Sequence, residues 1–85
     1  MFLQNENFTI YEVENLKNDC IAELQRNEII VDMKNVAKID IAAVSLLLSL
    51  KKSATAQNKK FKLQNCNYNI LMALSICGCD AYLGV

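Results

Sequence analysis

A run of three β-branched residues, Ile29, Ile30 and Val31, constrains the fold of this chain more than any other sequence feature. Such a run without polar alternation is typical of a strand that is buried on both faces, usually at the centre of a parallel sheet. A short polar segment follows, and Asp40 then precedes a mostly apolar stretch. Because aspartate is a good N-cap, we predict a helix from Asp40 to about Gln57.

Hydrophobic spacing and turn residues predict the other elements. Apolar residues recur at helical spacing from Val13 to Leu24, with Glu12 and Glu14 in the first turn. Phe61 and Leu63 alternate with polar residues, as in a strand that is exposed on one face. The predicted elements are strands at 2–4 and 8–11, a helix at 13–24, a strand at 28–33, a helix at 40–57, a strand around 61–63, and a helix capped by Asn67 or Asn69 that ends near Gly78.

This order, β-β-α-β-α-β-α, predicts an α/β fold. Strand-helix-strand units favour right-handed crossovers and parallel pairing, so we expect a mixed, mostly parallel four-stranded sheet packed with helices. The 85 residues are 53% hydrophobic, with two glycines and no proline. This composition indicates one domain over residues 1–85.

The helix at 40–57 has two distinct faces. Val44, Leu47 and Leu48 are expected to point into the core, together with the aliphatic part of Lys51. The opposite stripe is expected to face solvent, and its members are Ile41, Ser45, Ser49 and Lys52. The carboxylate of Asp40 either caps the helix or anchors a partner, and Asp32 is expected to organise the preceding loop as a hydrogen-bond acceptor.

Charge and hydropathy restrict the partners. The longest apolar stretch is interrupted by serines and is about half of the roughly 20 residues that cross a bilayer, and no secretory signal is expected. We therefore expect a cytoplasmic protein without direct membrane insertion. Five lysines lie between residues 51 and 62, without arginine and with few aromatic residues. They suit a helix end and a turn better than a nucleic-acid surface, so no nucleic-acid partner is predicted.

Enzymatic chemistry finds little support in the sequence. Histidine is absent, and the only glycines are Gly78 and Gly84, so there is no phosphate-binding loop. We expect no catalytic residue, no cofactor and no metal. The alternative is a thiol or metal site at Cys77 and Cys79, with help from Cys66. In the competing interpretation, Cys20 and Cys77 are small buried hydrophobic residues in a reducing compartment.

The segment from Asp32 to Ala43 resembles the signature of STAS domains, the sulfate transporter and anti-sigma factor antagonist family. That signature runs Asp-Leu-x-x-Val-x-x-Ile-Asp-Ser/Thr-x-Gly-Leu. The resemblance extends to Phe8-Thr9-Ile10-Tyr11 with Leu16-Lys17, and to Lys60 through Asn65 with Leu71, Leu74 and Gly78. The departures are Glu6 for a common glycine, Ile41 for Ser or Thr, Ala43 for glycine and Cys79 for leucine.

This resemblance implies a noncatalytic regulatory module that docks a protein partner through the loop and N-terminus of the second helix. The partner would be an anti-sigma factor or kinase, or else a subunit of an ABC-type phospholipid transporter. Isoleucine cannot accept phosphate, so the usual phosphorylation switch is missing. Ile41 either packs on the preceding loop or contacts the partner, and the exposed apolar stripe also allows a homodimer. The expected partner-binding residues are Asp40, Ile41, Ala42, Ser45 and Ser49.

Overall fold

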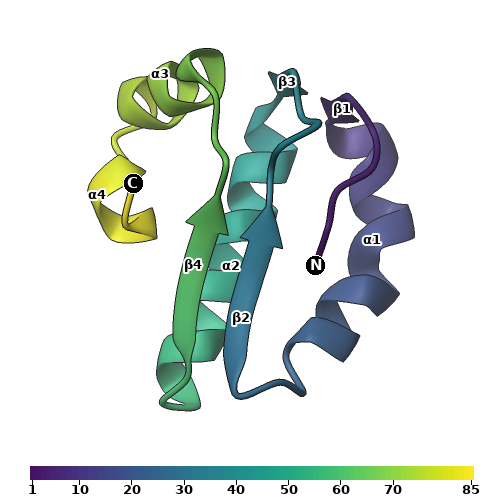
Figure 1. Cartoon of the computed structure of the whole chain (residues 1–85), viewed down its shortest axis with the longest axis vertical. Helices are drawn as coiled ribbons and strands as arrows, with labels where there is room; N and C mark the ends of the chain where they lie inside the picture. Colours follow the sequence, from purple (N-terminus) through teal and green to yellow (C-terminus); the bar gives the residue numbers. More distant parts are fainter.

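The computed structural model describes all 85 residues and alternates short strands with helices (Figure 1). Two of its elements were not predicted from the sequence: a short strand before the second helix and a helix near the C-terminus. The elements are β1 (Asn7–Phe8), α1 (Ile10–Glu23), β2 (Glu28–Asp32), β3 (Lys38–Ile39), α2 (Ile41–Ala56), β4 (Lys60–Gln64), α3 (Tyr68–Ile76) and α4 (Asp80–Leu83).

The strands form two separate two-stranded sheets. β2 pairs with β4 in parallel, from Glu28 opposite Lys60 to Asp32 opposite Gln64, and β1 pairs with β3 in parallel. The α/β class is confirmed. The prediction of one mixed four-stranded sheet is wrong, because the ladders are not continuous and every pairing is parallel.

The N-terminal segment explains why β1 does not add to the sheet formed by β2 and β4. Residues 2–4, predicted as a strand, make one isolated parallel bridge, between Phe2 and Asp32. Its two hydrogen bonds run from the Leu3 amide to the Asp32 carbonyl and from the Asp32 amide to the Met1 carbonyl. The chain then turns away, so β1 pairs beyond the end of β2 instead of beside it.

The predicted strand at 8–11 is wrong beyond Phe8, because α1 begins at Ile10. Thr9 has the extended backbone of an N-cap, and its Oγ1 donates to Oε1 of Glu12 at 3.0 Å. Thr9 and Glu12 have the spacing of a capping box, which favours a helix start over a strand. One consequence is that Ile10 and Tyr11 lie in the first turn of a helix.

The helix boundaries further along the chain agree with the sequence. Asp40 is the N-cap of α2, and Asn67, rather than Asn69, is the N-cap of α3. Gly78 follows α3 with a φ of 73°, a left-handed conformation that glycine adopts without strain. The Cys79 amide then bonds back to the Leu74 carbonyl and closes the helix end.

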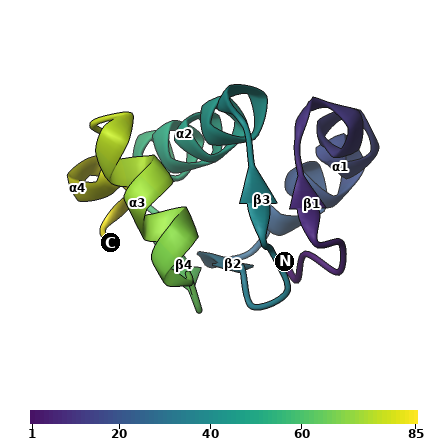
Figure 2. The same cartoon turned by 90° about the horizontal axis from the view of Figure 1, so that it is seen from above.

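The core lies between the β2–β4 pair and the helices that cover one of its faces (Figures 1 and 2). Val44 and Leu47 of α2 are buried and Leu48 is half-buried, while Ile41, Ser45, Ser49 and Lys52 are exposed, as predicted. Ile21, which shares the helical spacing of the apolar α1 residues, is instead exposed. No helix combines the length and apolar character needed to cross a membrane.

Glu23 is the one buried charged side chain. Its carboxylate accepts hydrogen bonds from the Met1 ammonium group at 2.8 Å and from the Ile30 amide at 3.3 Å. Burial opposes ionisation of Glu23, but these hydrogen bonds outweigh it and lower the pKa of the carboxyl group. The charge therefore has local partners, as buried charges require.

Candidate functional site

The starts of α1, α2 and α3 lie at one end of the molecule, around the loop that joins β2 to α2 (Figures 1 and 2). Asp40 joins two of these starts. Its Oδ1 accepts a hydrogen bond from the Ala43 amide at 3.0 Å, which caps α2. Its Oδ2 accepts from the Ile10 amide of α1 at 2.8 Å. One carboxylate therefore holds two helix starts together.

These contacts also affect the ionisation of Asp40. The hydrogen bonds from the Ala43 and Ile10 amides favour the charged form and lower the pKa of the carboxyl group. The N-termini of two helices supply amide dipoles of the sign that suits a negative charge. The cap expected from the sequence is confirmed, and its second oxygen has a structural partner that the sequence did not predict.

Asp32 organises the other end of the loop, as expected. Its Oδ1 accepts from the Lys34 amide at 3.0 Å and from Nδ2 of Asn65 at 3.1 Å. The contact with Asn65, followed by that with the Lys34 amide, lowers the pKa of the Asp32 carboxyl group. Asp32 thereby links the ends of the paired strands β2 and β4.

Asn67 ties the third helix start to the same loop. Its side-chain oxygen accepts from the Ile70 amide at 3.0 Å and caps α3, while its Nδ2 donates to the Val36 carbonyl at 2.9 Å. The Val36 side chain is itself buried. The loop is consequently held at both ends and in the middle.

Four large apolar residues are exposed at the helix starts, and we call them the apolar end. Ile41 is 69% exposed, Ile10 61%, Tyr11 83% and Tyr68 73%. Ile41 thus faces solvent and is not packed on the preceding loop. Ile10 and Ile41 each follow the paired strands β1 and β3 after one intervening residue, at the two helix starts that the Asp40 carboxylate joins.

The predicted partner-binding residues differ in their exposure to solvent. Ile41, Ser45 and Ser49 are exposed along one stripe of α2, while Ala42 is half-buried. Asp40 is also half-buried, and both of its oxygens already accept backbone amides. The sequence interpretation missed Ile10, Tyr11 and Tyr68. The spacing of Thr9 and Glu12 was the signal that places Ile10 and Tyr11 at a helix start.

The cysteines are not grouped as a metal site requires. Cys77 is exposed, contrary to the expectation that it is buried, whereas its neighbour Cys79 is buried and donates from Sγ to the Leu74 carbonyl. Burial raises the pKa of the Cys79, Cys66 and Cys20 thiols, which lowers their thiolate fraction. No group of three or more cysteine or carboxylate side chains is placed to hold a metal ion.

The fold and the helix starts define a small α/β domain with parallel strand pairs, in which three helices begin around one loop. A family model described as STAS domain matches residues 4–85, and the chain belongs to the STAS domain family. This membership indicates a regulatory or transporter-associated protein-interaction module. A search of curated proteins and a search of solved structures each gave no match.

Proposed function

We propose that this chain is a noncatalytic, cytoplasmic regulatory domain of the anti-sigma factor antagonist type, which docks a protein partner through the apolar end. The docking residues are those of the loop and the first turns of α2, namely Asp40, Ile41, Ala42, Ser45 and Ser49, joined by the other members of the apolar end, Ile10, Tyr11 and Tyr68. The observation that carries this proposal is the exposed Ile41 beside a carboxylate that fixes two helix starts.

The backbone of the docking residues is preorganised for binding. An apolar side chain contributes most to binding when its backbone is already held in the bound position, because less conformational entropy is then lost. Ile10 and Ile41 meet this condition, since the Asp40 carboxylate accepts from the Ile10 amide itself and from the Ala43 amide in the helical turn that carries Ile41. Aromatic residues such as Tyr11 are frequent anchors at interfaces. In this proposal Asp40 positions the docking residues through its backbone contacts.

The residue at position 41 decides whether phosphorylation can regulate docking. A phosphate at this position would place about two negative charges on an apolar contact and weaken it by repulsion and desolvation. Isoleucine has no hydroxyl group to accept phosphate, so docking is constitutive with respect to this position. Ser45 and Ser49 lie further along the same helix, and hydroxyl groups in a helix interior are poor kinase substrates.

Ile41→Asp tests the docking surface. Aspartate suits the first turn of a helix, so the variant keeps the fold while it places a charge on the proposed contact. Proteins captured by the wild type are identified by mass spectrometry, and the affinity of each purified partner is then measured. We expect Ile41→Asp to weaken binding at least about tenfold, as the loss of a central apolar contact does.

Ile21→Asp is the matched control. Ile21 is also an exposed helical isoleucine, but it lies in the last turn of α1, away from the helix starts. Its substitution should leave the affinity unchanged. Unaltered binding of Ile41→Asp to every identified partner would contradict the proposal. Capture of a transporter ATPase in place of an anti-sigma kinase would select the transporter alternative, and capture of the same chain alone would select a homodimer.

A further inference from the structure

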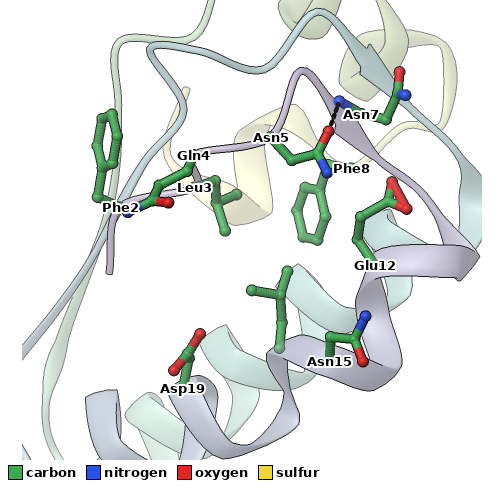
Figure 3. A pocket seen from close by; sticks show the side chains of 10 residues that line it. Phe2, Leu3, Gln4, Asn5, Asn7, Phe8, Glu12, Asn15 and Asp19 are labelled. Carbon is green, nitrogen blue, oxygen red and sulfur yellow. Dashed lines mark hydrogen bonds between the residues drawn. The ribbon is translucent and has the colours of Figure 1, made fainter.

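A groove lies between the N-terminal segment and α1, and none of its lining residues belongs to the apolar end. It encloses a cavity of about 560 Å³. Figure 3 shows Leu3 and Phe8 facing the cavity from the N-terminal segment, and Asn15 and Asp19 facing it from α1. Leu16 of α1 also lines the cavity, so the floor is apolar and the rim is polar.

The charged residues that line this groove are all acidic. Two of its ten lining residues are acidic, Glu12 and Asp19, and none is basic. Asp19 takes part in none of the ion pairs of the structure. Glu12 uses Oε1 to accept from Thr9, which leaves Oε2 for another donor. The rim therefore holds two carboxylates that a cationic group would complement.

A free backbone edge lines the same groove. The single bridge between Phe2 and Asp32 uses the Leu3 amide and the Met1 carbonyl, which point toward β2. Successive peptide groups of an extended chain point to opposite sides, so the amide and carbonyl of Phe2 point away from β2. Neither takes part in a hydrogen bond between backbone groups. An edge of this kind can accept one more strand.

We propose that this groove binds an extended, basic segment of a partner protein, which adds a strand beside Phe2. Lysine or arginine side chains at alternate positions of the segment reach Asp19 and Glu12, and their aliphatic parts pack on Leu3 and Leu16. Glu12 and Asp19 are about 10 Å apart along α1. Alternate side chains of a strand are about 7 Å apart, and long cationic side chains span the difference.

The probe is the blocked peptide acetyl-Lys-Val-Lys-Val-Lys-amide, titrated into the isotope-labelled full chain and followed by amide chemical shifts. We expect saturable shifts at residues 2–4 and along α1 near Glu12 and Asp19, and an affinity that falls as salt is added. The double variant Glu12→Gln with Asp19→Asn should weaken binding about tenfold or more, since two charge-assisted contacts are lost. Glutamine keeps the hydrogen bond from Thr9 and therefore the helix start.

Glu14→Gln is the matched control, because Glu14 lies on the same helix but pairs with Lys17 at 2.9 Å and does not line the groove. The Glu14→Gln variant should bind the peptide with the same affinity as the wild type. Three results would overturn the proposal: no saturable shifts, equal binding of the peptide with glutamate in place of lysine, or equal binding of spermidine, which has the charge but no strand backbone.

Discussion

The Asp40 carboxylate has a larger structural role than an ordinary N-cap, because each of its oxygens accepts a different backbone amide. The Ala43 amide belongs to α2 and the Ile10 amide to α1, thirty residues away in the chain. An asparagine at this position is normally as good an N-cap as aspartate. It has only one side-chain oxygen, however, and its amide group would face the Ile10 amide, donor against donor.

We therefore predict that Asp40→Asn lowers the melting temperature by roughly 5 °C at pH 7, although asparagine preserves a conventional cap. Circular dichroism melts measure the effect. Asp19→Asn is the control, because this exposed carboxylate makes no ion pair and its loss should change the melting temperature little. Equal melting temperatures for Asp40→Asn and the wild type would show that the bond to Ile10 does not stabilise the fold.

The difference in stability between the wild type and Asp40→Asn should depend on pH. The pKa of Asp40 is lowered in the folded state, first by the Ala43 amide and then by the Ile10 amide. The stabilisation is complete above the unfolded pKa of about 3.9 and is lost as the pH falls through the lower folded pKa. Melts between pH 7 and pH 2.5 should show the advantage over Asp40→Asn shrinking below about pH 4. A difference that stays constant to pH 2.5 would contradict this assignment.

At the scale of the elements, the starts of α1, α2 and α3 are held by side chains that also reach another element. Asn67 caps α3 through its oxygen and binds the Val36 carbonyl through its nitrogen. Serine is as good an N-cap but has no second group that can reach Val36. The two roles of Asn67 can therefore be separated by one substitution.

We predict that Asn67→Ser retains α3 but lowers the free energy of unfolding by about 1 kcal/mol, because the Val36 carbonyl loses its partner. Urea denaturation measures the change. Asn69→Ser serves as the control, since Asn69 is exposed in the first turn of the same helix and is not the cap. Equal losses in both variants would mean that the contact with Val36 contributes nothing.

The elements also differ in how far local sequence determines them. The start of α2 was predicted from Asp40 and that of α3 from Asn67 or Asn69, because an N-cap acts within one turn of the chain. The strand β3 has two residues and exists only by pairing with β1. The terminal helix α4 has four residues, too few to show a hydrophobic period. Neither short element carries a local signal of its own.

At the scale of the whole molecule, one buried cluster connects the N-terminal segment, the strands and the helices. Leu47 of α2 is among its fully buried members, together with Phe8, Val31, Ile70 and Leu83. A small domain has little stability in reserve, because it buries a smaller share of its surface than a large one. Removing atoms at the centre of this cluster therefore has consequences for the entire fold.

We predict that Leu47→Ala costs about 2–5 kcal/mol of unfolding free energy, since it removes buried apolar contacts and leaves a cavity. Urea denaturation should show a much lower midpoint, or no folded baseline. The control is Leu71→Ala, the same substitution at an exposed position of α3, which should cost less than half as much. Similar losses at both positions would place Leu47 outside the stabilising core.

The sequence by itself determined the features that depend on neighbouring residues: the caps of α2 and α3, the helical periods, the position of strand β2, and the isoleucine that removes a phosphorylation site at position 41. The burial of β2 on both faces was not borne out, because its residues alternate between buried and more exposed positions. Tertiary structure decided the rest. It paired β1 with β3 instead of extending the larger sheet, gave the second oxygen of Asp40 to Ile10, and buried Cys79 while exposing Cys77. The reason is range: a cap or a hydrophobic period acts within one or two turns of the chain, whereas these contacts depend on how distant segments pack.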